Sequence, residues 1–242
     1  MSWQLRWIVK PILFAVCLVP ALQLAAGAFG LLGVSLGADP VVMILHTTGL
    51  WALRFLVATL LMTPLKNLTG WIGWLRFRRM LGLFVFFYAL LHLSTYLFLD
   101  QDGKFGAIWQ DIVKRPYITL GMLGLLLLTP LAATSTSKAQ RRLGRRWTQL
   151  HRLVYVVAGL GVWHYWWLVK KDIRSPLAYA AMFAVLLGYR WGLHLWRQRR
   201  ARTTSIVGGR QDFFRIDRPT TGGRRLVSPG VSIREPQDAL IK

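Results

Sequence analysis

Three histidines of this sequence lie in long apolar runs, where a polar ring is costly. His92 lies in LFVFFYALLHLSTYLFL, and His151 and His164 lie near the two ends of LHRLVYVVAGLGVWHYWWL. Runs of this length can cross a bilayer, and polar side chains inside membrane spans usually have a function. Imidazole is a common axial ligand of haem iron, so the three rings predict a membrane protein that binds haem. The alternative is that each ring only hydrogen-bonds a neighbouring helix.

The composition supports a membrane protein. The chain has 242 residues, of which 54% are hydrophobic, and its formal net charge is +22. The basic residues lie mostly between apolar runs and in the C-terminal part, which indicates loops facing anionic lipid rather than nucleic-acid binding. Cys17 is the only cysteine, so an intrachain disulfide, a cysteine-ligated zinc site and an iron–sulfur cluster are excluded.

The apolar runs predict an all-α integral membrane protein with six transmembrane helices. We expect a short cytoplasmic N-terminus at residues 1–10, the six-helix bundle at 11–196 and a basic, largely disordered cytoplasmic tail at 197–242. The predicted spans are 11–32, 41–62 (ending at Thr63-Pro64), 80–99, 117–133, 150–168 and 177–196. Lysine and arginine are concentrated in alternate links, so the positive-inside rule places both termini in the cytoplasm.

Depth along the helices pairs two of the histidines. With that orientation, His92 lies about 18 Å and His164 about 21 Å from the cytoplasmic boundary, at a rise of about 1.5 Å per residue. Axial ligands from two facing helices need matched depths, so His92 and His164 are the first candidates for iron ligands.

His151 lies at the cytoplasmic end of the same run as His164. An ideal helix separates the two rings by about 140°, so one neighbouring helix would not face both of them. The corresponding positions before His92 are Arg78 and Arg79, which offer no second imidazole. His151 could serve an inner cofactor or be an ordinary interfacial histidine. His194, on the last run, fits the interfacial interpretation better.

Other polar side chains are candidates for contacts with a cofactor. His46, near the outer end of the second span, could contact a haem propionate, bind a quinol or lie at the lipid interface, the last being favoured slightly. Arg54, deeper in that span, could pair with a propionate or with helix carbonyls. The basic link could hold a flavin phosphate or simply anchor the chain on the cytoplasmic side, and it contains Arg141, Arg142, Arg145 and Arg146.

The order and spacing of several segments resemble a known family. Four segments are similar to the MsrQ family, formerly YedZ: GADPVVMILHTTGLWALRFLVATLLMTPL, RRMLGLFVFFYALLHLSTY, RPYITLG and TSTSKAQRRLGRRWTQLHRLVY, the last followed by HYWW. These are the haem-binding membrane subunits of a bacterial periplasmic methionine sulfoxide reductase system. The similarity covers about residues 35–170.

The resemblance implies a ferric-reductase-like transmembrane domain in the bacterial inner membrane, with b-type haem (one or two) and FMN. It places the family's haem histidines on His92, His151 and His164. Electrons would come from the quinone pool or a cytoplasmic flavin reductase, and would go to MsrP, a periplasmic molybdopterin enzyme. The catalytic reduction of methionine sulfoxide would then occur on that partner chain. The alternatives are a stand-alone ferric or quinone reductase and a non-redox membrane scaffold.

Overall fold

The computed structural model describes residues 5–169 and 173–216, and every element in these ranges is helical. In chain order the helices are η1 (Leu5–Val9), α1 (Lys10–Ala28), η2 (Leu31–Gly33), α2 (Pro40–Thr69), α3 (Trp74–Thr95), η3 (Tyr96–Asp100), α4 (Phe105–Lys114), α5 (Pro116–Ala133), α6 (Ser137–Leu143), α7 (Arg145–Leu150), α8 (Leu153–Leu168) and α9 (Arg174–Ile216). The chain forms two compact units, residues 1–194 and 195–242.

Four helical stretches in the described residues are long and apolar enough to cross a membrane. They are Trp7–Ala28, Pro40–Thr69, Trp74–Asp100 and Pro116–Ala133. These match the first four predicted spans. The fifth and sixth spans stay predictions, because α8 has only 16 residues and α9, although long, is less apolar.

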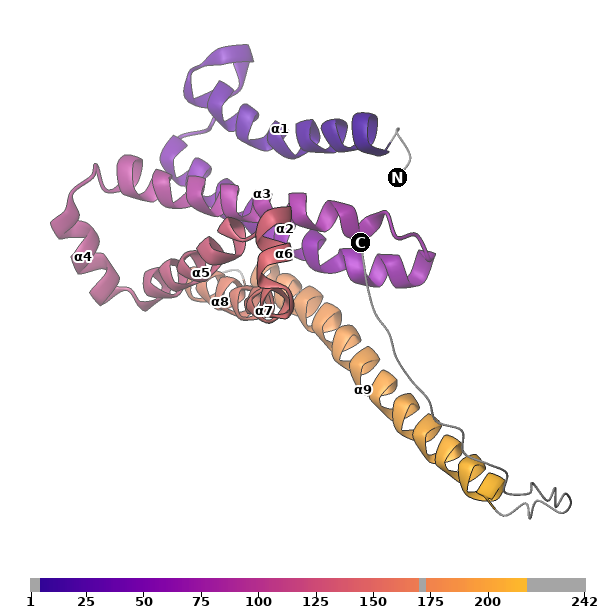
Figure 1. The fold of residues 1–242 in the computed structure, drawn as a ribbon. Coiled ribbons are helices and arrows are strands. Elements are labelled where there is room, and N and C mark those ends of the chain that lie inside the picture. The colour runs from indigo at the N-terminus through magenta and orange to yellow at the C-terminus, as the bar shows by residue number, and fades with distance from the viewer. Residues whose placement is uncertain (1–4, 170–172, 217–242) are drawn as a thin grey trace, which may run out of the picture. The chain divides into compact units, whose positions relative to one another are not determined.

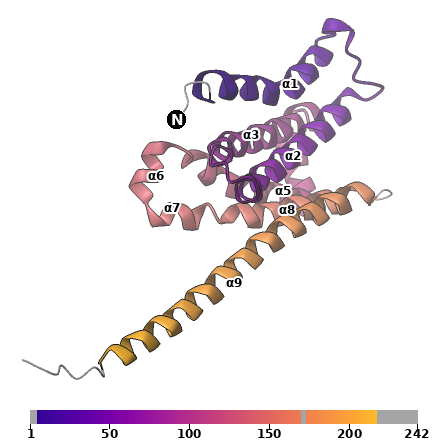
Figure 2. The same ribbon diagram turned by 90° about the vertical axis from the view of Figure 1, so that its right-hand side faces the viewer.

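The first unit is built from two pairs of helices. Figure 1 and Figure 2 show α2 beside α3, and α5 beside α8, and these two pairs make the most extensive helix–helix contacts among the described residues. The α3 and α5 helices also contact each other and so join the pairs. Both pairs run antiparallel, so α2 and α5 begin where α3 and α8 end. We call this the Asp100 end, and the opposite end, where α6 and α7 lie, the α6–α7 end.

Local signals set several helix ends. The Asp39 carboxylate accepts a hydrogen bond from the Val42 amide at 3.1 Å and caps α2, whose first residue is Pro40. The helix ends at Gly70, whose φ of +70° lies in the left-handed region that favours glycine.

The prediction that the second span ends at Thr63-Pro64 is wrong, because α2 continues through Pro64 to Thr69. Proline has no N–H, so the Leu60 carbonyl, one turn earlier, loses its helical donor. A guanidinium nitrogen of Arg190 on α9 donates to that carbonyl at 2.8 Å. The same side chain donates to the Tyr155 hydroxyl and the Thr63 hydroxyl at 2.7 and 2.9 Å. A tertiary contact therefore satisfies the carbonyl that the proline leaves without a donor.

A side chain also hydrogen-bonds the backbone near a proline where α1 meets α3. Pro20 lies inside α1, and the fully buried Tyr88 hydroxyl of α3 lies close to the helix at this point. The hydroxyl accepts from the Ala21 amide at 3.1 Å and donates to the Cys17 carbonyl at 2.9 Å. In a regular helix this amide would bond directly to this carbonyl. The Tyr88 hydroxyl therefore bonds both backbone groups of this turn of α1 within the apolar core.

Two segments differ from the sequence-based expectation. The link between the third and fourth spans contains α4, a ten-residue amphipathic helix. The last helix also continues to Ile216, so residues 197–216 are helical rather than disordered as expected. Arginine, glutamine and alanine are frequent just after Trp196, and their high intrinsic helix propensity favours a helix there. The remainder of the predicted tail, 217–242, lies outside the described residues.

Candidate functional site

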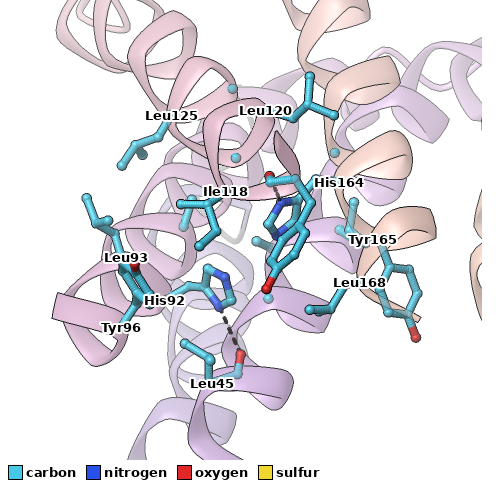
Figure 3. Close-up of a pocket in the computed structure, with 18 of the residues that line it drawn as sticks. Leu45, His92, Leu93, Tyr96, Ile118, Leu120, Leu125, His164, Tyr165 and Leu168 are labelled. Atoms are coloured by element: carbon cyan, nitrogen blue, oxygen red, sulfur yellow. Dashed lines mark hydrogen bonds between the residues drawn. The ribbon is translucent and has the colours of Figure 1, made fainter. Parts of the chain in front are cut away.

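A cavity of about 540 Å³ lies among α2, α3, α5 and α8 and is lined by both His92 and His164. Cofactor sites in proteins usually measure about 300–1,000 Å³. Figure 3 shows the two imidazoles on the cavity wall, with leucine, isoleucine and tyrosine side chains around them. The structure thus brings together the two histidines whose depths match in the sequence.

His92, on α3, is fixed by the first turns of α2. Its Nδ1 lies 2.9 Å from the Leu45 carbonyl oxygen, the bond drawn in Figure 3. Gly49 follows one turn later, and a Cβ atom there would lie only 3.2 Å from the imidazole. The carbonyl orients the ring, and the glycine leaves the space for it against α2.

His164, on α8, is fixed by α5 in the same way. Its Nδ1 lies 2.6 Å from the Tyr117 carbonyl oxygen. Gly121 follows one turn later, and a Cβ atom there would lie 3.0 Å from the ring. Both histidine–carbonyl bonds join residues 47 positions apart, so the two helix pairs hold their imidazoles in equivalent ways.

These hydrogen bonds determine which ring nitrogen is available to a metal. A carbonyl oxygen only accepts, so Nδ1 of each histidine must carry the proton. Nε2 of the neutral ring then keeps its lone pair, and this is the arrangement typical of metal-binding histidines, whose other nitrogen donates to a carbonyl.

The separation of the two rings fits one metal ion between them. The centroids of His92 and His164 lie 6.2 Å apart and the ring planes meet at 88°. Two metal–imidazole bonds of about 2 Å, together with about 1 Å from each nitrogen to its ring centre, span about 6 Å. In the described residues no group of three or more His, Cys, Asp or Glu side chains could hold a metal. Two histidines suit a metal whose other ligands come from a macrocycle, as those of haem iron do.

The other candidate side chains lie at different places. His46 lines the cavity at the Asp100 end, 6.3 Å from the Tyr165 ring between centroids. Arg54 does not line it: its side chain is exposed and its guanidinium lies over the Trp51 ring, 4.7 Å from the centroid. His194, on α9, is exposed and does not line it either.

His151 lies at the α6–α7 end, at the residue where α7 ends, and does not line the cavity. Its Nε2 lies 3.1 Å from the Thr134 hydroxyl, and its ring stacks on Trp147 at 4.0 Å between centroids. The Thr134 hydroxyl already donates to the Pro130 carbonyl at 2.6 Å, so Nε2 of His151 is the donor in their bond. The nitrogen that stays available is Nδ1, the reverse of His92 and His164.

Burial and charge keep His151 neutral. Its pKa lies below the usual value because burial penalises the imidazolium, and because Arg78 and Arg79 add repulsion. The neighbouring basic helices α6 and α7 carry four exposed arginines, none of which lines the histidine cavity: Arg141, Arg142, Arg145 and Arg146.

Sequence reasoning missed the groups that support the two imidazoles. They are the backbone carbonyls of Leu45 and Tyr117, and the glycines at 49 and 121. One feature of the sequence could have indicated them: Gly49 precedes His92 by the same number of residues as Gly121 precedes His164, in LHTTG…H and YITLG…H. It also missed Arg115, which lines the cavity at the Asp100 end.

Comparison with known proteins gives a consistent result. The family model for the ferric reductase like transmembrane component matches residues 48–162, which include His92 and His151 but stop just before His164. No solved structure matches the chain.

Several curated proteins are similar over most of their length. The protein-methionine-sulfoxide reductase heme-binding subunit MsrQ of Xanthomonas euvesicatoria pv. vesicatoria (strain 85-10) is 56% identical over 171 residues, which is 71% of this chain and 77% of that protein. The protein of the same name from Xanthomonas campestris pv. campestris (strain B100) is 55% identical with the same coverage. The one from Brucella anthropi is 50% identical over 187 residues, which is 77% of this chain and 80% of that protein.

Proposed function

The chain belongs to the MsrQ family of ferric-reductase-like integral membrane proteins, and from this we propose that it is a membrane b-type cytochrome. It would pass electrons across the inner membrane to a periplasmic molybdopterin enzyme, MsrP, that reduces methionine sulfoxide in proteins. The names of the relatives, which describe heme-binding subunits of a protein-methionine-sulfoxide reductase, support this proposal.

The observation that carries the proposal is the paired geometry of His92 and His164. Their rings lie 6.2 Å apart, and each donates Nδ1–H to a backbone carbonyl, which leaves Nε2 for iron. The iron of a bound haem would supply a one-electron redox couple. His92 and His164 would hold the iron through their Nε2 atoms, and the leucine, isoleucine and valine side chains of the lining would keep water away from it.

The direction of transfer follows from the charges on the links. All four acidic residues of the described part of the first unit lie at the Asp100 end or in its links: Asp39, Asp100, Asp102 and Asp111. Arginines dominate the α6–α7 end. By the positive-inside rule, the α6–α7 end and both termini face the cytoplasm, and six spans cross the membrane. The histidine cavity then lies in the periplasmic half, near the proposed acceptor.

Electrons would enter at the cytoplasmic side, from quinol or a flavin reductase. His151 lies at this side and does not line the histidine cavity, so we assign it no iron in that cavity. The exposed arginines of α6 and α7 offer guanidinium groups to the phosphate of FMN. No step of the proposal depends on that flavin.

Haem content tests the proposal directly. The protein is purified in detergent from cells with sufficient haem, and haem per polypeptide is measured with reduced-minus-oxidised spectra. We expect one low-spin b-type haem in wild type and in His151→Ala. His92→Ala and His164→Ala should each lose the low-spin spectrum, because each removes an axial ligand.

His151→Ala is the matched control, since it removes an imidazole from outside the cavity. A wild-type protein that is folded and colourless would contradict the haem assignment. A spectrum that is lost in His151→Ala but kept in the other two variants would contradict the choice of ligands. Electron transfer from reduced protein to the periplasmic enzyme, rather than to ferric chelates alone, then tests the acceptor.

A further inference from the structure

The polar side chains of the histidine cavity are concentrated at one end. In the described part of the chain, the ionisable side chains that line the cavity, apart from the two paired histidines, all lie at the Asp100 end: His46, Tyr96, Asp100, Arg115, Tyr117 and Tyr165. Deeper in the cavity the lining is apolar and includes Leu56, Val85, Leu128 and Val157. Haem has a similar distribution of polarity, with an apolar ring and two propionate carboxylates on one edge. The cavity therefore accepts it with the carboxylates toward the Asp100 end.

Among the residues that the structure describes, Arg115 is the only lysine or arginine that lines this cavity. Arg115 is the residue immediately before α5, and it lies two positions before Tyr117, whose carbonyl orients His164. A carboxylate that enters this end therefore meets a cation next to the backbone that positions an iron ligand. Arg54, the arginine that the sequence suggested for this role, lies outside the cavity.

The guanidinium of Arg115 is held close to the rim but can still bind another group. Its Nε lies 3.4 Å from a carboxylate oxygen of Asp111, whose other oxygen accepts from the Tyr96 hydroxyl at 3.3 Å. The pKa of Arg115 lies above its usual value, chiefly because of a hydrogen bond with the Tyr117 side chain and also because of Asp111. The group is thus charged at every physiological pH.

The ion pair with Asp111 leaves Arg115 free to make a second contact. The Arg115 side chain is 52% exposed, and ion pairs at such positions contribute only about 0–1 kcal/mol. Guanidinium has five N–H donors, so it can keep Asp111 on one edge and bind a second carboxylate on another.

We propose that Arg115 binds a haem propionate at the Asp100 end of the cavity and so fixes the direction in which the haem is seated. This rests on the haem assignment proposed above. A cation at this place also stabilises the reduced haem, which carries one positive charge fewer at the iron. Arg115 therefore raises the reduction potential and slows the loss of haem.

The test uses Arg115→Gln and Arg115→Lys in the full-length, haem-loaded protein, with Lys114→Gln as the matched control. Lys114 is the adjacent residue, carries the same charge and is exposed, but it does not line the cavity. The measurements are the midpoint potential, from a potentiometric titration of the haem absorbance, and the rate of haem transfer to a haem-scavenging protein.

We expect Arg115→Gln to lower the midpoint potential and to accelerate haem loss about fivefold, the factor that corresponds to about 1 kcal/mol for an exposed ion pair. Arg115→Lys should retain most of the wild-type potential, because it keeps the charge. Lys114→Gln should leave both quantities near the wild-type values, since its charge is screened by solvent.

Equal shifts in Arg115→Gln and Lys114→Gln would overturn the proposal, because they would reflect general surface charge. So would an Arg115→Gln protein with wild-type potential and wild-type haem loss. In both cases the wild type still contains haem, so only the role of Arg115 fails. A wild type without haem would instead overturn the proposed function, and this inference with it.

Discussion

The imidazole rings of His92 and His164 lie 6.2 Å apart and nearly perpendicular, although 72 residues of chain separate them along the sequence. On one side, each ring hydrogen-bonds a backbone carbonyl and packs against a glycine, both of which belong to the neighbouring helix of its pair. A ring whose Nδ1 is hydrogen-bonded, and which packs closely against a glycine on one side, holds its Nε2 in one direction. The site is therefore preformed, and its supporting glycines are open to direct tests.

Gly121→Ala should displace His164 and weaken haem binding. A Cβ atom at this position would lie 3.0 Å from Cε1 and Nδ1 of the ring, closer than a normal contact. Overpacking of this kind costs about 1–3 kcal/mol, so we expect haem affinity to fall at least about fivefold. Gly159→Ala, on the helix that carries His164, is the control, because no atom of the described residues lies within 4 Å of a Cβ atom there and Gly159 does not line the cavity. Equal haem affinities in the two variants would show that the glycine at 121 does not position the ring.

Tyr88→Phe should destabilise the fold without changing its shape. The hydroxyl hydrogen-bonds both the Ala21 amide and the Cys17 carbonyl, and its removal takes both of these hydrogen bonds from an apolar core. Each hydrogen bond contributes about 0.5–1.5 kcal/mol, so the free energy of unfolding in detergent micelles should fall by about 1–3 kcal/mol. Tyr179→Phe, where the hydroxyl makes no hydrogen bond to the described residues, should change it far less. The prediction is wrong if the two variants unfold at the same denaturant concentration.

Stability should fall as the pH is lowered through the usual histidine range, in part because of His151. Its pKa lies below 6.5, first because of burial and then because of Arg78 and Arg79. Below about pH 6.5 the unfolded chain binds a proton at this residue that the folded chain does not bind, so the folded state loses stability as the pH falls. In His151→Gln, the decrease in melting temperature between pH 8 and pH 5 should be smaller than in wild type. An unchanged pH profile would exclude His151 as a contributor.

Arg190→Met should destabilise the packing of α9 on α2, and the effect should depend on Pro64. Arg190 donates to the Leu60 carbonyl, which lacks a helical donor because Pro64 has no N–H. Hydrogen bonds from charged groups contribute about 1.5–3 kcal/mol, so we expect a loss of about 2 kcal/mol in the free energy of unfolding. Pro64→Ala restores a backbone N–H to α2. In that background Arg190→Met should cost less, and an equal cost in both backgrounds would contradict this explanation.

The sequence alone determined the quantities that depend on distance along a helix. The apolar runs predicted six spans, and four of these coincide with described helices that are long and apolar enough to cross a membrane. The rise per residue placed His92 and His164 at one depth, and the structure brings them together. The resemblance of ordered segments to the MsrQ family is confirmed by the relatives that are 50–56% identical. These properties are local, or additive along the chain, so no tertiary information was needed.

The tertiary structure decided which groups meet across helices. The sequence suggested Arg54 as the partner of a carboxylate, but Arg54 lies outside the cavity, and it is Arg115 that lines it. Pro64 looked like a helix end and lies inside α2, because Arg190, more than a hundred residues later, satisfies the carbonyl that the proline leaves. The available nitrogen of each histidine likewise depends on a distant oxygen, from Leu45, Tyr117 or Thr134. Rotation about the helix axis and pairing between distant residues are set by packing, and hydrophobic periodicity does not encode them.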